Sequence, residues 1–319
     1  MAASTAIDAA LVARFREALD QLNPDGGKLG LAVSGGPDSM AMLLLAHEAI
    51  PGGFEVATVD HGLRPEAKDE CALVVAACEE RGLPCEVLSV EVGEGNVQAQ
   101  ARAARYKALA DWAERRDLAA IATAHHVDDQ AETLLMRLNR GSGVAGLAGV
   151  RASQRRADLQ VAIIRPLLGF ARAELAEIIA GAGQAVASDP SNSDPRYDRV
   201  RMRQVLADCD WLDRSALAQS ASHLAEAYEA LQDYAQVLWP QMVTQTADGF
   251  VLTPGSSREM NRRLLAMVMQ EMGGKPRGGD VARLLTRLEQ GEGGNVAGIL
   301  AKVKNGVWEL VPEPPRQTG

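Results

Sequence analysis

The sequence predicts an α/β protein whose main domain is a doubly wound, mostly parallel β-sheet, followed by a helical linker and a small α+β domain. Short apolar segments alternate with helical patterns from residue 6 to residue 182, which is typical of a parallel sheet covered by helices on both faces. Polar residues and glycines follow several apolar segments directly, where such sheets bind ligands. The alternation stops after Tyr197. We therefore expect a first domain over residues 1–210, a linker over 211–242 and a second domain over 243–319.

The first domain is expected to begin with an amphipathic helix over Ala6–Leu22 and a turn over Asn23–Gly27. Strands are expected at Leu29–Val33, Phe54–Asp60, Cys85–Val92, Leu118–Ala124 and Gln160–Ile164. Helices are expected at Met40–His47, Glu66–Arg81, Asn96–Arg116, Asp128–Asn139 and Arg172–Ala182, with Asn96 as an N-cap. This order places the carboxyl ends of the strands, and the polar residues after them, at one edge of the sheet.

Beyond Tyr197 the pattern is helical from Arg201 to Trp239, and its alanine-rich part, Ser215–Ala235, suits a linker helix. The second domain is expected to contain a strand, two helices and a hairpin that turns at Asn305-Gly306. Their ranges are Gly249–Leu252, Ser257–Met272, Gly279–Glu289 and Val296–Val311.

Composition excludes several classes of protein. A chain of 319 residues can bury a sizeable core, and its longest apolar runs, such as Met40–Ala46, are too short to span a membrane. The amino terminus lacks a basic segment followed by an apolar one, so we expect a cytoplasmic location. The four cysteines form no Cys-x-x-Cys pair, and we expect core thiols rather than metal ligands. They are Cys71, Cys78, Cys85 and Cys209.

The arginines are unevenly distributed. The formal net charge of −9 is unusual for a nucleic-acid-binding protein. Between residues 137 and 172, however, seven arginines stand against one acid, Asp158, and a second cluster follows. These clusters predict a local basic surface, with arginines on solvated helix faces as the alternative. The arginines are Arg137, Arg140, Arg151, Arg155, Arg156, Arg165 and Arg172, then Arg196, Arg199, Arg201 and Arg203.

The segment Ser34-Gly35-Gly36-Pro37-Asp38-Ser39 joins the first strand to a helix. Its glycines let the backbone approach an anion and adopt positive φ, and the amides and dipole at a helix start favour negative charge. It is not a Walker A loop, because no Gly-Lys-Ser/Thr ends it. Asp38 stands there instead, and a carboxylate beside polyphosphate requires a divalent cation between them. The loop therefore indicates ATP with Mg²⁺, with an ordinary strand-to-helix turn as the alternative.

A second polar cluster, His125-His126-Val127-Asp128-Asp129-Gln130-Ala131-Glu132-Thr133, follows the strand Leu118–Ala124 and begins a helix. On that helix Asp129, Thr133, Arg137 and Arg140 share one face, and Asp128 and Glu132 share a neighbouring one. Two alternatives stay open: a metal-dependent hydrolase and a purely structural cap of the helix. Adjacent histidines point in different directions and suit a single Zn²⁺ poorly, and the His-Glu-x-x-His arrangement is absent.

These motifs carry two family resemblances. The string at 34–39 resembles the pyrophosphatase loop of N-type ATP-pyrophosphatases, which cleave ATP between the α- and β-phosphates and adenylate a substrate. The string from Thr123 to Thr133, continued by Arg140-Gly141-Ser142-Gly143, is similar to the signature of tRNA(Ile)-lysidine synthases. The resemblance spans Leu29–Arg203, and the tail resembles that family's first carboxy-terminal domain. Further family-like blocks lie at Val59–Arg64, Ala104–Tyr106, Arg165–Leu168 and Asp189–Asn192.

The resemblance implies an adenine nucleotide α-hydrolase-like fold and a ligase that uses ATP and Mg²⁺. Such a ligase adenylates the C2 carbonyl oxygen of the wobble cytidine in a CAU-anticodon tRNA(Ile), and L-lysine then displaces AMP to give lysidine. Residues 1–210 would form the ATP-pyrophosphatase catalytic domain, and residues 243–319 a tRNA-binding domain.

The resemblance also implies roles for single residues. Asp38 and Asp129 would hold Mg²⁺, Arg140 would neutralise developing charge, and Asp129 or Glu132 would deprotonate lysine or hold its ammonium group. The nucleotide would contact Ser34, Gly35, Gly36, Pro37, Asp38, Ser39, Asp60 and His61. Phosphates of tRNA would contact Arg151, Arg155, Arg156, Arg196, Arg199, Arg201 and Arg203. Val200 departs from the family, which usually has asparagine after that arginine.

Two other functions fit part of the pattern. A cytidine thiolase of the same superfamily would use cysteine pairs for sulfur or an iron-sulfur cluster, and this sequence has none. A catalytically idle tRNA-binding module would release no pyrophosphate. The sequence leaves open how tRNA(Ile) is distinguished from the tRNA(Met) that shares its anticodon, and the oligomeric state, with a homodimer as one alternative.

Overall fold

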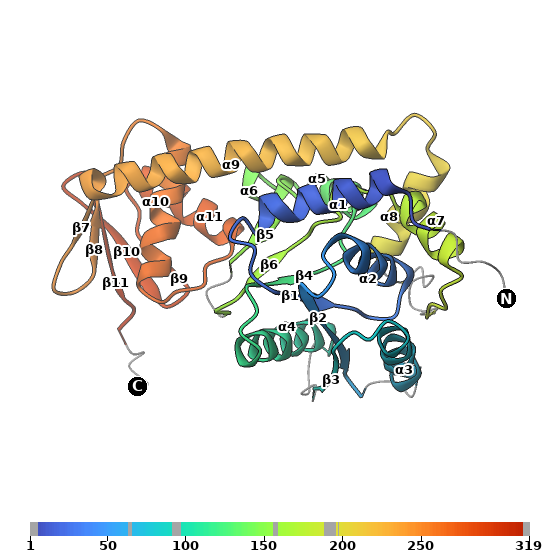
Figure 1. Ribbon diagram of the computed structural model, residues 1–319. Helices are drawn as coiled ribbons and strands as arrows, with labels where there is room; N and C mark the ends of the chain where they lie inside the picture. Colours follow the sequence, from blue (N-terminus) through green and yellow to red (C-terminus); the bar gives the residue numbers. More distant parts are fainter. Residues whose placement is uncertain are drawn as a thin grey trace. The chain divides into compact units, whose positions relative to one another are not determined.

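The computed structural model describes residues 6–62, 66–90, 97–155, 159–187, 196 and 198–314. The chain forms two compact units, Met1–Ala225 and Glu226–Gly319, and passes from one to the other within helix α9 (Arg214–Met242; Figure 1). In the described part of the chain, no helix is both long and apolar enough to cross a membrane.

Over the described residues, the first unit contains a six-stranded sheet in the order β3-β2-β1-β4-β6-β5. All neighbouring strands are parallel except β5, which pairs antiparallel with β6 at the edge. The predicted α/β class with a mostly parallel sheet is thus confirmed. The strands are β1 (Leu29–Ala32), β2 (Phe54–Asp60), β3 (Cys85–Ser89), β4 (Ala120–Ala122), β5 (Ser153–Gln154) and β6 (Ala162–Ile164).

Helices cover both faces of this sheet, with α1 and α2 on one side and α4 on the other (Figure 1). Gly30 of β1 faces α4 so closely that an added Cβ would lie 2.5 Å from the Trp112 ring. The helices of this unit are α1 (Ala9–Leu22), α2 (Pro37–Ala49), α3 (Glu66–Glu79), α4 (Val97–Arg115), α5 (Val127–Asn139), α6 (Val144–Leu147), α7 (Arg172–Ala182) and α8 (Asp198–Asp208).

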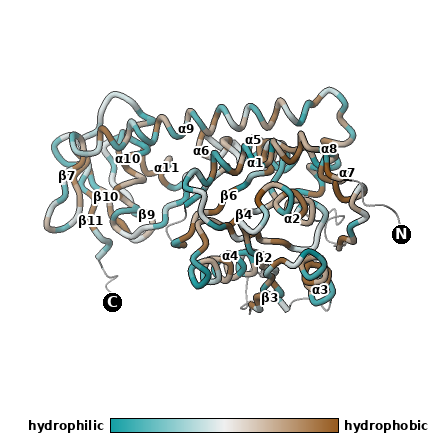
Figure 2. The backbone as a smooth tube through the Cα atoms, in the orientation of Figure 1, coloured by the Kyte–Doolittle hydropathy of each residue, from teal (hydrophilic) through white to brown (hydrophobic). Residues whose placement is uncertain are grey.

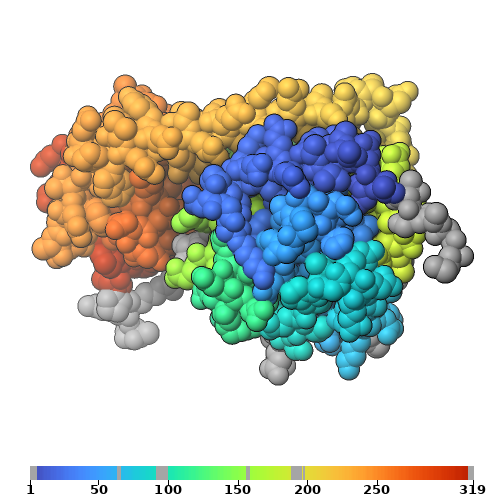
Figure 3. Space-filling model, viewed as in Figure 1, coloured from blue at the N-terminus to red at the C-terminus, as the bar shows by residue number. Residues whose placement is uncertain are grey.

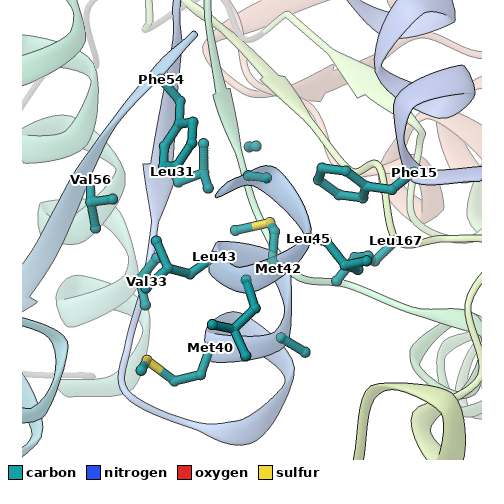
Figure 4. Close-up of a cluster of buried hydrophobic side chains, with 14 of the residues drawn as sticks. Phe15, Leu31, Val33, Met40, Met42, Leu43, Leu45, Phe54, Val56 and Leu167 are labelled. Carbon is teal, nitrogen blue, oxygen red and sulfur yellow. The ribbon is translucent and has the colours of Figure 1, made fainter. Parts of the chain in front are cut away.

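Helix α2 is apolar from Met40 to Ala46, and all seven of these residues are buried. Met42 lies between the strand residues Leu31 and Phe54 and the side chains of Phe15 and Leu167 (Figure 4). Each of these five side chains is buried. Helix α1 packs against α2 and forms part of the surface seen in Figure 3, where its atoms are dark blue. The helix that begins at the Ser34–Ser39 loop therefore has a fixed position in the core, and so does its amino terminus.

The predicted elements of the first unit are confirmed, with shorter ends for several of them. The predicted helical run Arg201–Trp239 is wrong as one element, because it is interrupted between α8 and α9. The interruption has a local cause: Asp213 Oδ1 accepts hydrogen bonds from the amides of Ser215 (2.7 Å) and Ala216 (3.2 Å), and so starts a new helix. The short elements α6 and β5 were not predicted. Asn96, Arg156 and the block Asp189–Asn192 lie outside the described residues.

The second unit contains an antiparallel sheet, five-stranded over the described residues, in the order β7-β8-β11-β10-β9. The hairpin of β10 and β11 turns at Asn305-Gly306, as predicted, and β8, α10 and α11 are confirmed; β7 and β9 were not predicted. Helix α9 alternates between hydrophilic and hydrophobic residues along its length (Figure 2). The elements are β7 (Val243–Gln245), β8 (Phe250–Leu252), α10 (Arg258–Glu271), α11 (Gly278–Glu289), β9 (Gly294–Val296), β10 (Ile299–Lys304) and β11 (Val307–Pro312).

Candidate active site

A cleft of about 310 Å³ lies at the carboxyl ends of β1, β2 and β4. Its walls come from the loop after β1, the residues that follow β4, and the helices α3, α4, α5, α7 and α8. The two polar clusters singled out in the sequence therefore meet in one place, as expected for the edge of a parallel sheet at which ligands bind. From these clusters the lining includes Ser34, Gly36, Pro37, Asp38, Ser39, His125 and Asp129, and His61, which follows β2, lines the cleft as well.

The Ser34–Ser39 loop has the geometry of an anion cradle. Gly35 has φ +80°, and a Cβ added there would lie 3.0 Å from the backbone oxygen of Glu70, so the position requires glycine. Gly36 is the N-cap of α2 and Pro37 follows it, and no side chain caps this helix end. Ser39 Oγ accepts a hydrogen bond from the Ser34 amide (3.1 Å) and donates one to the Gly36 carbonyl (3.0 Å). Hydrogen bonds between its own residues thus stabilise the loop, and the amino terminus of α2 faces the cleft.

His126 connects this loop to helix α5. Its Nε2 lies 3.4 Å from Asp38 Oδ2 and 3.7 Å from Asp129 Oδ2. Burial alone would lower the pKa of His126, but the nearby carboxylates of Asp128, Asp38 and Asp129 raise it to about 9. His126 is therefore a cation at neutral pH. Its Nε2 thus lies beside two carboxylates from different elements, Asp38 and Asp129.

The donor set fits Mg²⁺ only together with a phosphate ligand. Asp38 and Asp129 each offer a carboxylate oxygen near the same point, and Mg²⁺ in proteins is commonly held by one or two carboxylates, substrate phosphates and water. Among the described residues, no group of three or more His, Cys, Asp or Glu side chains could hold a metal ion.

Glu132 binds two arginines of helix α8. Its Oε2 accepts a hydrogen bond from Arg199 Nε (2.7 Å) and its Oε1 one from Arg203 Nε (2.8 Å), while Arg199 Nη2 also donates to Asp129 Oδ1 (2.6 Å). The Glu132 side chain is 2% exposed. These contacts fix α8 against α5 and place both guanidinium groups in the cleft wall.

Asp128 is turned away from the cleft, although it is adjacent to Asp129. Its carboxylate accepts a hydrogen bond from the Arg172 amide (3.0 Å) and lies 3.2 Å from Arg214 Nη1. Burial would raise its pKa, but the neighbouring His126 imidazole (3.6 Å) and the hydrogen bond from the Arg172 amide lower it to about 2. Asp128 thus joins α5 to the start of α7.

Two cleft arginines, Arg105 and Arg172, were not predicted as site residues. Arg105 of α4 stacks over the Tyr106 ring, 5.2 Å from its centroid, and its Nε has no hydrogen-bond partner. Arg165, which is 3% exposed, donates to the Arg151 carbonyl and to Gln154 Oε1 rather than to a carboxylate. Arg105 belongs to the block Ala104–Tyr106 quoted from the sequence, which was the one signal that could have identified it.

His125 is the neutral member of the histidine pair. Burial is the main cause that lowers its pKa to about 3, and the charges of Arg165 and Arg199, followed by Arg102 and Arg105, act in the same direction. Its Nδ1 lies 3.1 Å from Thr123 Oγ1. The two adjacent histidines therefore carry different charges at neutral pH.

Several predicted site residues lie elsewhere. Arg140 pairs with Asp198 (2.8 Å) and does not line the cleft, and Asp60 accepts a hydrogen bond from the Gly62 amide. Arg151 donates to the Ala148 carbonyl, and Arg201 pairs with Asp198. Arg155 and Arg196 are exposed.

Comparisons with known proteins bear on the family to which the chain is similar. The family model of the PP-loop domain matches residues 8–209. A tRNA(Ile)-lysidine synthase of Novosphingobium aromaticivorans is 46% identical over 310 residues, which cover 96% of this chain and 94% of that protein. The enzyme of the same name from Zymomonas mobilis is 38% identical over 314 residues, covering 95% and 94%.

The chain is also similar in fold to a solved structure. A U34-tRNA thiolase from Methanococcus maripaludis superposes with a TM-score of 0.53 and 20% identity, covering 70% of this chain and 80% of that chain. At this identity the likeness concerns the fold alone.

Proposed function

This chain belongs to the tRNA(Ile)-lysidine synthases, ATP-dependent ligases of the PP-loop family, and from that premise we propose how its cleft works. ATP adenylates the C2 carbonyl oxygen of the wobble cytidine in a CAU-anticodon tRNA(Ile), and pyrophosphate leaves. The side-chain amine of L-lysine then attacks C2 and displaces AMP.

One observation carries the assignment of the site. Asp38, from the loop after β1, and Asp129, from the helix after β4, both lie within 4 Å of His126 Nε2 in the same cleft. An anion cradle and a pair of carboxylates are thereby brought together. That combination suits a magnesium nucleotide held by its phosphates.

In the first step the loop at 34–39 would hold the phosphates through its amides and hydroxyl groups. When bound, Mg²⁺ would offset the charge that develops on the leaving pyrophosphate. Arg105, Arg172 and Arg203 line the same cleft and would stabilise that charge as well. Arg140 would have to leave Asp198 before it could contribute.

In the second step Glu132 acts as a positioning residue. Both of its oxygens are engaged by arginines, so it would fix Arg199 and Arg203 rather than bind lysine directly. Asp129 keeps one oxygen that Arg199 does not engage. We assign that oxygen to Mg²⁺ or to the lysine ammonium group.

The exposed arginines would bind tRNA phosphates, which position the RNA without reading its bases. They are Arg155, Arg196 and Arg201. We add the half-buried Arg151 and the sequence neighbour Arg156 to this group. We also retain residues 243–319 as a tRNA-binding domain. Because tRNA and ATP are both cytoplasmic, the protein would act there. Light scattering would decide between a monomer and a homodimer.

The decisive experiment incubates the protein with ATP, Mg²⁺, labelled lysine and either tRNA(Ile) or tRNA(Met), both with the CAU anticodon. We expect label in tRNA(Ile) alone, with one pyrophosphate released for each lysine attached. Pyrophosphate release without lysine incorporation would favour another tRNA-modifying enzyme of this superfamily. An absence of release with the cognate tRNA would favour the idle module.

A further inference from the structure

Two arginines of helix α4, Arg102 and Arg105, lie beside one buried tyrosine. Their guanidinium carbons lie 5.0 and 5.2 Å from the centroid of the Tyr106 ring, and Arg102 Nη2 donates to the Tyr106 hydroxyl oxygen (3.4 Å). Tyr106 is 1% exposed. Arg105 lines the cleft, and Arg102 is exposed about one helical turn earlier. The two side chains therefore extend the cleft wall toward solvent as a cationic strip.

The positive charges of this strip have no counter-charge among the described residues. There, no carboxylate pairs with Arg102, Arg105 or the neighbouring Arg165, which follows β6. Arg165 is 3% exposed and donates to the Arg151 carbonyl and to Gln154 Oε1, which are both neutral acceptors. In the same part of the chain, the Nε atoms of Arg105 and Arg165 are buried without a hydrogen-bond partner. Because buried charges in proteins are usually paired, this group of arginines lacks an anion.

The three arginines act on the same tyrosine. Burial would raise the pKa of the Tyr106 hydroxyl group, but the charges of Arg102, Arg105 and Arg165 lower that pKa below its usual value. Like charges that lie so close repel one another, and a bound anion relieves the repulsion. Guanidinium groups bind phosphate through paired hydrogen bonds. A phosphate is therefore the anion that this wall of the cleft suits best.

The position of the arginines favours an RNA phosphate over the phosphates of the nucleotide. The nucleotide has its own cradle at the start of α2, on one face of the sheet, whereas α4 covers the other face (Figure 1). A small anion in the cleft would need Arg105 alone. Arg102 is exposed and outside the cleft lining, which suits a polyanion that reaches the cleft from solvent. The substrate of this family, tRNA(Ile), is such a polyanion.

We propose that Arg102 and Arg105 bind the backbone phosphates that flank the wobble nucleotide of tRNA(Ile). This proposal rests on the proposed function, in which the wobble base enters the cleft. Helix α4 then forms an RNA-binding surface separate from the arginines at 151–156 and 196–203. Arg105 has several N–H donors, so it can contact one of these phosphates and the leaving pyrophosphate as well. Tyr106 is buried and positions both guanidinium groups without contacting the RNA.

The test measures the binding of tRNA(Ile) in the absence of ATP. Arg102→Gln and Arg105→Gln should each bind about 5-fold more weakly at about 0.1 M salt, and each should reduce the slope of log K against log salt by about 0.7. Arg102→Lys keeps the charge and should keep the slope. Arg102→Gln should change the Kd for ATP with Mg²⁺ by less than about 2-fold, because the nucleotide is held at α2. Arg115→Gln is the matched control, since Arg115 is exposed on α4 but pairs with Glu86.

Chemically modified tRNA locates the contacts. A methylphosphonate removes the charge of one phosphate, and tRNA(Ile) with this group on either side of the wobble nucleotide should bind the unchanged protein about 5-fold more weakly. For each arginine variant, one of these two modifications should cause no further loss, because the contact is already absent. A methylphosphonate in the acceptor stem should have the same effect on the variants as on the unchanged protein.

Losses that add at both flanking phosphates would overturn the proposal, and so would an unaltered salt slope in both arginine variants. Weaker binding of ATP alone by Arg105→Gln, with unchanged tRNA binding, would assign the arginines to the nucleotide instead. If the unchanged protein releases no pyrophosphate with tRNA(Ile) and ATP, the proposed function itself fails. Pyrophosphate release together with unaltered tRNA binding by both variants would contradict this inference alone. Thermal unfolding of each variant shows whether the fold is intact.

Discussion

His126 Nε2 lies 3.4 Å from Asp38 Oδ2, which ties the helix that follows β4 to the loop that follows β1. These two strands are neighbours in the sheet, so their carboxyl ends bring the imidazole and the carboxylate together. The contact gives Asp38 a fixed position beside the cradle of α2. A change in its charge should therefore affect the nucleotide step specifically.

Asp38→Asn is predicted to abolish adenylation while leaving tRNA binding intact. The variant keeps the shape of the side chain but loses the charge that would hold Mg²⁺ beside the phosphates. We expect tRNA-dependent pyrophosphate release to fall by about 100-fold or more, and the Kd for tRNA, measured by filter binding, to change by less than about 2-fold. Asp20→Asn, on the exposed side of α1, is the control. Unchanged turnover would remove Asp38 from the site.

Asp129→Asn is predicted to raise the Mg²⁺ concentration required for half-maximal pyrophosphate release. One carboxylate of the pair beside His126 would lose its charge, and a metal held by fewer anionic ligands binds more weakly. The measurement is a Mg²⁺ titration at fixed ATP and tRNA, with a shift of about 10-fold expected. Asp128→Asn is the neighbouring comparison, because Asp128 does not line the cleft and contacts Arg172, Arg214 and the far side of His126. A titration curve identical to that of the unchanged protein would exclude Asp129 as a ligand.

The meeting of the two polar clusters could be predicted from the sequence for a general reason. In a parallel sheet every strand ends at the same edge, so Asp38 and Asp129 had to approach each other once the β-α order was recognised. The loop chemistry at Gly35 and Gly36 is likewise local. Those parts of the site follow from short stretches of sequence.

The positions of Arg199 and Arg203 in the cleft wall could not be predicted, because the carboxylates that bind them are distant in the chain. Glu132 and Arg199 are separated by 67 positions, and no local pattern indicates that α8 lies against α5. Arg199 and Arg203 were therefore assigned to tRNA phosphates as part of a basic cluster. The interrupted helix before Arg214 was missed for a similar reason, since Asp213 is one polar residue in an otherwise helical pattern.

Glu132→Gln is predicted to destabilise the first unit and to lower activity together. Glutamine removes the counter-charge of Arg203 and one of the two carboxylates that bind Arg199, which keeps Asp129. Breaking such a buried arrangement costs about 3 kcal/mol. For a unit of this size the Tm should fall by about 6–12 °C. Lysidine formation, measured with labelled lysine below the new Tm, should fall because Arg199 and Arg203 lose their position. Glu177→Gln, exposed on α7, is the control. A variant with unchanged Tm would show that these pairs contribute nothing to the fold.

The double variant in which alanine replaces both Arg155 and Arg156 is predicted to bind tRNA more weakly. Its affinity for tRNA is also predicted to depend less on salt concentration. Arg155 is exposed, and Arg156 follows it in sequence. Each lost phosphate contact reduces the slope of log K against log salt by about 0.9, so the slope should fall by about one to two. The control replaces Lys107 and Arg115 of α4, which are exposed and already paired with Asp111 and Glu86. An unaltered slope would place the two arginines outside the interface.

Glu55→Gln is predicted to lower stability in a pH-dependent way, far from the cleft. Glu55 lies in β2 with its side chain 8% exposed, and it binds Arg116 Nε (2.7 Å) and Lys28 Nζ (2.8 Å). The hydrogen bond from Arg116 is the main cause that holds the pKa of Glu55 below its usual value, with Lys28 acting in the same direction against burial. Because both partners are about half exposed, we expect a loss of about 2 kcal/mol at pH 7 and a Tm lower by about 4–8 °C.

The sign of the pH effect follows from the depressed pKa of Glu55. A carboxyl group with a lower pKa in the folded state stabilises the fold above its unfolded pKa, and this contribution disappears as the pH falls through the folded pKa. The Tm difference between the unchanged protein and Glu55→Gln should therefore be constant from pH 7 to about pH 5 and should narrow below about pH 4. Glu86→Gln is the matched control, since Glu86 also pairs with an arginine of α4 but is 43% exposed. Its Tm should change by less than about 2 °C at any pH. A difference for Glu55→Gln that persists undiminished to pH 3 would show that the lost interaction does not depend on the charge of the carboxylate.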